Sequence, residues 1–296
     1  MSKPLSHADG MILVLLAGVF WSTMGIGIRS IVDANVWQIL LYRSIALTLF
    51  LLLIISVRSK WKPWRTIKRS GAAGVIGGWG LVFAFSGGIY AIQTTTVANA
   101  MFLFASAPFL AAFLGWVILR ESVRKSTWYA MIIAIFGIIM MVVDGFSTGN
   151  STGNISAMLS ATGFAVFTIA LRWGKLEDMM PTVLLAGYFA TIVALTVCLV
   201  NDYSLHLSSN DAIISVAMGV FQVGVGLAIF TLGSKVVPAA ELALLCMTEV
   251  LLGPIWVWIF LGETASTYTL IGGAILMVAI GLNALTGLRR KPIPVL

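Results

Sequence analysis

The sequence predicts an all-α polytopic membrane protein, in which ten transmembrane helices form two inverted five-helix repeats around a central cavity. Three observations carry this prediction: ten apolar stretches of similar length, an uneven distribution of basic residues among the connections, and a match between the two halves of the chain. Charged residues make up only 10% of the 296 residues, and hydrophobic residues make up 59%. Since a soluble domain carries about 25% charged residues, the composition argues against a soluble enzyme.

Each apolar stretch is about long enough to cross a bilayer, because a transmembrane helix needs roughly 20 apolar residues. The connections between the stretches are short, so little of the chain remains for an extramembrane domain. The predicted spans are 11–32, 36–57, 71–92, 97–119, 127–143, 154–171, 181–200, 212–232, 239–261 and 267–288.

The basic residues set the predicted orientation. With the amino terminus in the cytoplasm, alternate crossings place all Lys and Arg residues except Arg29 and Arg43 on the cytoplasmic side. This is the positive-inside pattern, so the net charge of +7 reflects topology, and no nucleic-acid partner is expected. We therefore expect a cytoplasmic (inner) membrane protein with both termini in the cytoplasm. The cytoplasmic set is Lys3, Arg58, Lys60, Lys62, Arg65, Lys68, Arg69, Arg120, Arg124, Lys125, Arg172, Lys175, Lys235, Arg289, Arg290 and Lys291.

The chain matches itself at an offset of about 142 residues, which predicts repeats at 1–146 and 147–296. Each repeat holds five crossings, and because five is odd the second repeat enters the membrane from the opposite side. Inverted repeats of this kind are common in secondary transporters and favour alternating access. The matched positions are Gly10 with Gly153, Leu16 with Leu159, Arg29 with Arg172, Trp116 with Trp258, and Glu121 with Glu263.

Small residues and prolines indicate where helices pack and bend. The third span is rich in glycine, and Gly74 with Gly78 forms a GxxxG pair that lets helices approach closely. Two interpretations stay open, namely tight static packing and a helix that slides or bends during transport. Pro108 and Pro254 each remove a backbone donor within a span, which favours kinks there.

Short motifs recur in both halves. The first half carries Ala107-Pro108-Phe-Leu-Ala-Ala-Phe, Leu119-Arg-Glu121 and Ile135-Phe-Gly137, and the second carries Thr248-Glu249-Val, Gly253-Pro254 and Leu261-Gly-Glu263. Over nearly the whole chain these motifs resemble the EamA family of the drug/metabolite transporter superfamily. The resemblance implies a cavity lined mainly by the helices other than the fifth of each half, and export of amino acids or other small metabolites in many members. This chain departs from the family pattern in one place, because Val250 rather than proline follows Glu249.

Charged residues at bilayer depth are rare and usually functional. Glu249 lies about ten residues into the ninth span, and two interpretations stay open: a site for a substrate cation or proton, or a static partner for an arginine or hydroxyl group. Arg43 lies in the second span, where its guanidinium suits a substrate carboxylate, although pairing with Glu249 or facing an outer vestibule is also open. Further polar and aromatic candidates for the substrate site are Trp21, Trp79, Tyr42, Tyr90, Asn99 and Gln222.

The sequence favours a secondary transporter over other membrane proteins. No GxxxxGK[ST] motif for nucleotide binding occurs, and the only histidines, His7 and His206, lie outside the predicted spans without an HExxH motif. We therefore expect no enzymatic activity, no metal and no cofactor. The expected partners are the lipid bilayer, a small-molecule substrate and protons if Glu249 carries them. Export of amino acids or related small compounds is the preferred hypothesis; uptake or facilitated diffusion, and a non-transporting receptor or scaffold, are the alternatives.

Overall fold

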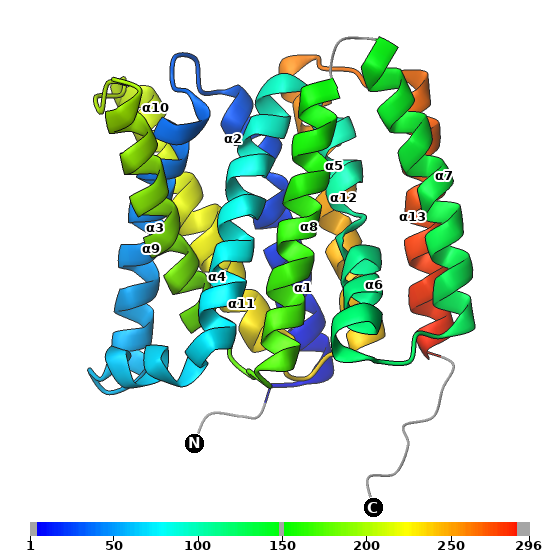
Figure 1. Cartoon of the computed structure of the whole chain (residues 1–296), viewed down its shortest axis with the longest axis horizontal. Helices are drawn as coiled ribbons and strands as arrows, with labels where there is room; N and C mark the ends of the chain where they lie inside the picture. Colours follow the sequence, from blue (N-terminus) through cyan, green and yellow to red (C-terminus); the bar gives the residue numbers. More distant parts are fainter. Residues whose placement is uncertain (1–4, 148–150, 289–296) are drawn as a thin grey trace, which may run out of the picture.

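The computed structural model describes residues 5–147 and 151–288 of the chain, and within them ten helical spans are long and apolar enough to cross a membrane (Figure 1). The ten-helix prediction is confirmed, and the described residues contain no strand. Lys3, Arg289, Arg290 and Lys291, which the sequence places on the cytoplasmic side, lie outside the described residues.

The first repeat contains five spans, two of which are interrupted. Their helices are α1 (His7–Ser22) and α2 (Met24–Arg29), α3 (Val36–Arg58), α4 (Pro63–Thr94), α5 (Val97–Phe104) and α6 (Ala107–Leu119), and α7 (Lys125–Ser147). The predicted boundary between residues 146 and 147 falls at the end of α7 and stays a prediction.

The second repeat runs in the opposite orientation, so that α5 and α12, which begin corresponding spans, start from opposite ends of the molecule (Figure 1). Its helices are α8 (Ser151–Trp173), α9 (Met180–Val200), α10 (Ser209–Ala217) with the π-helix η1 (Met218–Val225) and α11 (Gly226–Gly233), α12 (Ala239–Leu261), and α13 (Thr267–Leu288).

One end of the molecule, which we call the basic end, holds the start of α1, the end of α13 and the α3–α4, α6–α7, α8–α9 and α11–α12 connections (Figure 1). Twelve of the fourteen described Lys and Arg residues belong to these connections or the adjoining helix turns, as the charge pattern predicts. Arg29 and Arg43 lie elsewhere. We call the other end, with the α2–α3, α4–α5, α9–α10 and α12–α13 connections, the opposite end.

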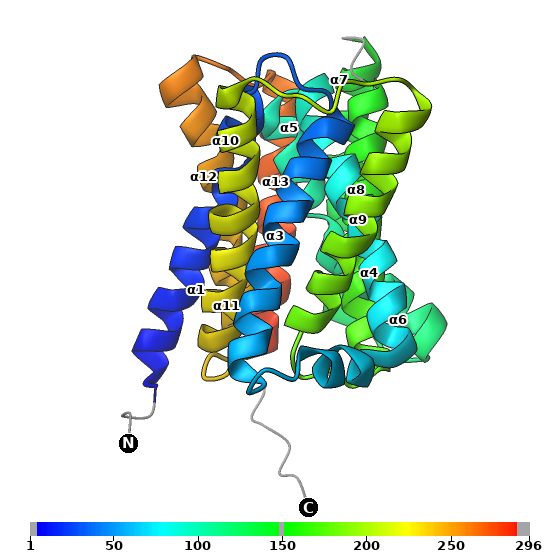
Figure 2. The ribbon, with the colours of Figure 1, turned by 90° about the vertical axis from the view of Figure 1, so that its left-hand side faces the viewer.

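The α4 helix begins eight residues earlier than the sequence predicts. Gly71 has φ 52° and ψ −147°, a conformation that glycine adopts without steric cost, and it kinks the helix there. The residues before it, Pro63–Ser70, include three basic side chains and form a short helical segment that lies across the basic end (Figure 2). Hydropathy alone places the span after Gly71, because this segment is too polar to enter the membrane.

The two prolines behave differently. In the fourth span the helix breaks at Ala105 and Ser106, and Pro108 lies in the first turn of α6, where its missing N–H costs no hydrogen bond. Pro254 lies inside α12, which continues as one helix across it. Of the two positions where a kink is predicted, the chain is therefore interrupted just before Pro108, whereas the helix is unbroken at Pro254.

Glycine-lined contacts hold the spans together. The α4 helix packs most extensively on α8 and also on α9, and these contacts pass through Gly80 and Gly87 on the α8 side, Gly78 on the α9 side and Gly77 against both helices. The fifth spans of the two repeats, α7 and α13, pack on each other, with Gly137 against Gly272. They form a separate pair at one side of the molecule (Figure 1).

Candidate functional site

Arg43 is the most deeply buried basic side chain of the described residues, with 3% of its surface exposed. It lies on α3, and its guanidinium carbon lies 5.0 Å from the centre of the Phe85 ring on α4, a distance at which a cation is attracted to the ring face. Its Nη1 atom has no hydrogen-bond partner. Burial of a charge costs free energy unless other groups compensate for it. An anionic group that binds here would therefore stabilise the buried guanidinium.

Gln222 lies on η1, next to α3. Gly219 of η1 allows this approach, because a methyl group there would lie against the carbonyl oxygen of Arg43 and 3.1 Å from the backbone nitrogen of Leu47. The Gln222 side chain is 5% exposed, and its Oε1 atom lacks a hydrogen-bond partner. A π-helical segment within a span is often found at functional sites, and this one carries a further unpartnered polar group beside α3.

Trp21 closes the α1 side of the same region. A methyl group on Gly226, at the start of α11, would lie 2.6 Å from the indole Nε1 of Trp21, so α1 and α11 meet at this glycine. The Trp21 ring also contacts Phe230, with ring centres 5.2 Å apart. These contacts place Trp21 beside the span that carries Gln222.

Glu249 lies near the middle of α12 and is partly buried. It packs against α1 at Gly18, where a methyl group would lie 3.6 Å from the Glu249 backbone nitrogen. The Glu249 carboxylate makes no hydrogen bond or ion pair with any described residue, and the expected alternative of a pair with Arg43 is not formed. Arg43 and Glu249 are therefore a cation and a carboxylate within the spans that form no ion pair with any described residue.

Two further predicted residues have structural partners instead. The Tyr42 hydroxyl donates a hydrogen bond of 2.8 Å to the Leu205 carbonyl in the α9–α10 connection, at the opposite end. Asn99 is fully buried in a polar cluster in which its amide donates to Asn154 and to the Thr95 hydroxyl at 3.1 Å. Both side chains hold elements together in this structure.

Trp79 and Tyr90 lie on the outer face of α4, away from Arg43. Trp79 stacks on Phe189 with ring centres 5.3 Å apart, and 43% of its surface is exposed in an apolar groove between α4 and α8. Tyr90 is 38% exposed on the same helical face. The structure thus brings Arg43, Gln222 and Trp21 to adjacent helices around α3 and η1, with Glu249 across α1, and leaves Trp79 and Tyr90 outside.

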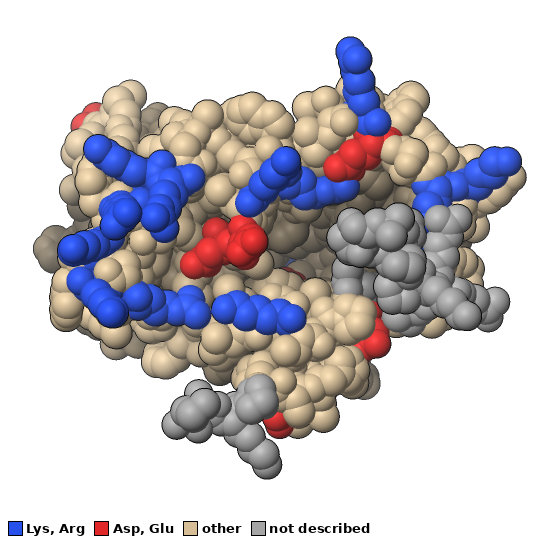
Figure 3. Space-filling model, turned by 90° about the horizontal axis from the view of Figure 1, so that it is seen from below, with Lys and Arg blue, Asp and Glu red and all other residues tan. Residues whose placement is uncertain are grey.

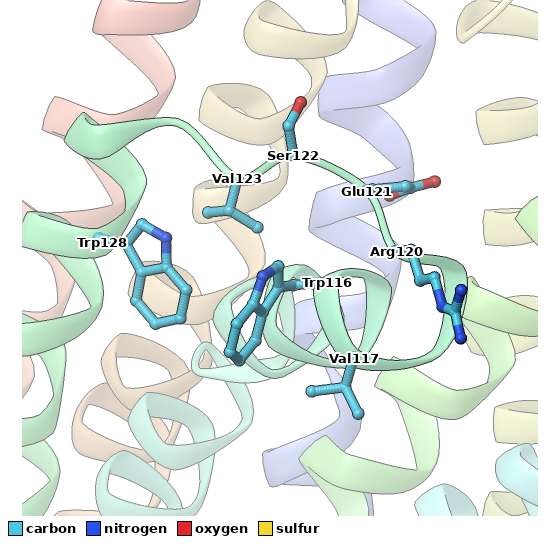
Figure 4. Close-up of a pocket in the computed structure, with 7 residues that line it drawn as sticks. All are labelled: Trp116, Val117, Arg120, Glu121, Ser122, Val123 and Trp128. Atoms are coloured by element: carbon cyan, nitrogen blue, oxygen red, sulfur yellow. The ribbon is translucent and has the colours of Figure 1, made fainter.

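A pocket with a volume of about 590 Å³ lies at the basic end, away from these charges (Figure 4). Trp116 and Trp128 form one wall of it, and Arg120 and Glu121 lie on the other side. It is wide open, and it contains none of the predicted substrate-site residues. Figure 3 shows a separate hollow at the centre of the basic end, which Lys and Arg side chains surround, with acidic side chains at its edge.

Sequence reasoning did not identify two parts of the arrangement. Phe85 has no polar or charged atom that would identify it as a site residue. Only the structure shows that the Arg43 guanidinium lies over its ring. The ion pair between Arg29 and Glu263 at the opposite end was also missed, although both residues appear among the matched repeat positions. The match between the two repeats is the sequence signal that could have identified this ion pair.

Comparisons with known proteins find similarity to a protein family, to individual relatives and to a solved structure. Residues 8–143 and 151–285 match the EamA-like transporter family. Human solute carrier family 35 member G1 is 23% identical over 299 residues, covering 93% of this chain and 78% of that protein. The pseudopaline exporter CntI of Pseudomonas aeruginosa is 23% identical over 275 residues, covering 92% and 94%. A solved crystal structure superposes with a TM-score of 0.68 at 14% identity over 96% of this chain and all of that one, a likeness of fold.

Proposed function

Because this chain belongs to the EamA-like transporter family of the drug/metabolite transporter superfamily, we propose that it exports amino acids or related small polar or amphipathic metabolites by alternating access. The observation that carries the proposal is Arg43, a buried guanidinium with an unpartnered nitrogen. A guanidinium binds carboxylates through two parallel hydrogen bonds, so a substrate carboxylate would supply the missing partner. Gln222 lies on the adjacent helix to hold a second polar group.

Glu249 gives the proposed site its second charge. An unpaired carboxylate within a span suits a substrate ammonium group or a proton, and the two unpaired charges together suit a zwitterion such as an amino acid. A proton carried by Glu249 would couple export to the proton gradient, which fits a chain without a nucleotide-binding motif. One relative is named as an exporter, of pseudopaline, and this supports the outward direction.

Arg43→Ala tests the carboxylate role. The purified protein is placed in liposomes and tested with radiolabelled amino acids and with their carboxamide analogues. The unchanged protein should transport the amino acids, which carry the carboxylate. The variant should lose carboxylate transport at least about tenfold, the value of one hydrogen bond to a charged group, and lose less with the carboxamides. Arg65→Ala, at an exposed position on the basic end, is the matched control and should transport normally.

Two outcomes of this experiment would contradict the proposal. Equal loss of carboxylate and carboxamide transport would assign Arg43 to the structure rather than to the substrate. If the unchanged protein moved no solute of a broad metabolite panel, the transporter proposal would fail for this site, and a receptor or scaffold role would be favoured.

We also propose that the basic end faces the cytoplasm, with both termini on that side of the inner membrane. The support is the clustering of basic side chains at the end where α1 begins and α13 ends (Figure 3). A reporter enzyme that is active only in the cytoplasm, fused after the last residue, should be active. Activity of a periplasm-specific reporter at the same fusion point would reverse the orientation.

A further inference from the structure

The two ends of the molecule carry the same two residue types at matched repeat positions. Arg29 matches Arg172, and Glu263 matches Glu121. In the structure each arginine pairs with the glutamate of the other repeat: Arg29 Nε lies 2.8 Å from Glu263 Oε2 at the opposite end, and Arg172 pairs with Glu121 at the basic end. Each ion pair therefore joins the two repeats.

At the opposite end the ion pair extends to the α4–α5 junction. The other carboxylate oxygen of Glu263 accepts a hydrogen bond of 2.6 Å from the backbone N–H of Val97, the first residue of α5. Arg29 Nη2 donates a hydrogen bond of 2.8 Å to the Thr95 carbonyl. We call these four residues the clasp. Glu263 thus caps a helix N-terminus, where a negative charge is stabilised.

The clasp joins two groups of helices. On one side, α1 packs on α12 and α11, and α2, which carries Arg29, packs on α12; on the other, α4 packs on α8 and α9, and α5 and α6 pack on α8. The α3 helix contacts both groups, because it packs on η1 and α10 and also on α9. Arg29 and Glu263 belong to the first group, and Thr95 and Val97 connect helices of the second. The clasp therefore holds the two groups together at the opposite end.

The basic end has the ion pair without the rest of the clasp. The repeat offset matches Val97 with Ala239, which is likewise the first residue of its helix, and Thr95 with Val237. Among the described residues, however, the side chains of Glu121 and Arg172 bond only to each other. The ion pair is also more open to solvent, with side chains 37% and 46% exposed against 19% and 28% for Glu263 and Arg29.

A second contact is formed at the opposite end and lacks a described counterpart at the basic end. At the opposite end, Gln93 Nε2 donates a hydrogen bond of 3.1 Å to the Ala34 carbonyl, between the same two groups of helices. The repeat offset matches these residues with Lys235 and Glu177, which carry opposite charges. The described contacts include no ion pair between them, and the basic end is hollowed near its centre (Figure 3).

We propose that Glu121 and Arg172 form a second clasp, which closes the basic end by binding the α11–α12 junction at Val237 and Ala239. This proposal rests on alternating access, a part of the proposed function. The structure is then the state in which the opposite end is clasped and the basic end is open. In the reverse state the second clasp is complete and the first is broken, because the inverted repeats exchange their conformations.

Thiol accessibility in detergent measures the two clasps without any substrate. Val97→Cys, in a background with Cys198→Ala and Cys246→Ala, reports on the opposite end, because the Val97 side chain is fully buried against Gly25. The substitution keeps the backbone N–H that Glu263 binds. Since the thiol reacts only when the opposite end opens, its rate follows the population of that state.

Loss of each clasp should change this rate in opposite directions. Glu263→Gln should raise the reaction rate of the Val97→Cys thiol about tenfold, since it weakens hydrogen bonds to a charged group that hold the opposite end closed. Glu121→Gln should lower it by a similar factor, since it weakens the clasp that stabilises the reverse state. Arg172→Gln should act like Glu121→Gln. The control is Glu241→Gln, which breaks an ion pair with His7 at the basic end within one helix group and should leave the rate unchanged.

If Glu263 and Glu121 had a merely structural role, substitution of either one would loosen the molecule. Both glutamate variants would then raise the reaction rate of the Val97→Cys thiol. That result, or an unchanged rate in Glu121→Gln and Arg172→Gln protein whose thermal stability shows that it is folded, would overturn the proposal. Since the assay contains no solute, a failure to find a transported amino acid would leave its outcome unaffected.

Discussion

A Glu249→Gln variant is expected to lose transport at least about tenfold, or to transport at a rate that no longer depends on pH. The carboxylate lies within α12 and has no partner among the described residues, so its charge is available to a substrate ammonium group or to a proton. A hydrogen bond to a charged group is worth about 1.5–3 kcal/mol, which corresponds to a change of tenfold or more. The measurement is initial uptake into liposomes across a series of pH values.

The control is Glu241→Gln on the same helix, since the Glu241 carboxylate pairs with His7 at 2.8 Å near the end of the span. That variant should transport normally with unchanged pH dependence. Glu249→Asp separates charge from shape, because it keeps the carboxylate and should retain more activity than Glu249→Gln. Unchanged flux and unchanged pH dependence in Glu249→Gln would remove this residue from the mechanism.

The spans were predictable from the sequence because they depend on hydropathy and length. The predicted limits of the fourth, ninth and tenth spans agree with the helices, and the others differ by a few residues at either end. The main exception is α4, whose first turns lie before Gly71. They lie across the basic end, and no apolar run indicates them.

The candidate site was predictable only in part. Arg43, Gln222 and Glu249 were found because charged or polar groups within a span need a reason to be there. Trp79 and Tyr90 satisfied the same depth criterion but lie on the outer face of α4. Depth along a helix follows from sequence position, whereas the direction of a side chain depends on which neighbours the helix packs against.

The glycines of α4 indicate which face of this helix packs against its neighbours, and therefore which side chains point outward. Gly80 and Gly87 face α8, Gly78 faces α9 and Gly77 contacts both helices, so together they define the packed side of the helix. Trp79 and Tyr90 are offset from that row. The sequence shows the row but does not show which helix it packs against, because close approach between helices depends on the tertiary fold.

Gly80→Ala should destabilise the folded protein by about 1–3 kcal/mol, the usual cost of overpacking a well-packed contact. A methyl group on Gly80 would lie 2.7 Å from the Gly163 carbonyl oxygen and 3.0 Å from the Phe167 backbone nitrogen of α8. Backbone atoms cannot rotate away, so the two helices must separate. The melting temperature in detergent and the fraction of monodisperse protein by size-exclusion chromatography should both fall.

Gly281→Ala on α13 is the matched control, because no heavy atom lies within 4 Å of the added methyl group. In an exposed helix, alanine is favoured over glycine by about 1 kcal/mol, so both substitutions gain the same helix propensity, and their difference isolates the packing cost. Gly281→Ala should be neutral or stabilising. Gly163→Ala, which places a methyl group against the Gly80 carbonyl oxygen, should repeat the loss from the α8 side. If Gly80→Ala and Gly163→Ala were as stable as Gly281→Ala, the close α4–α8 crossing, and with it the outward placement of Trp79, would be wrong.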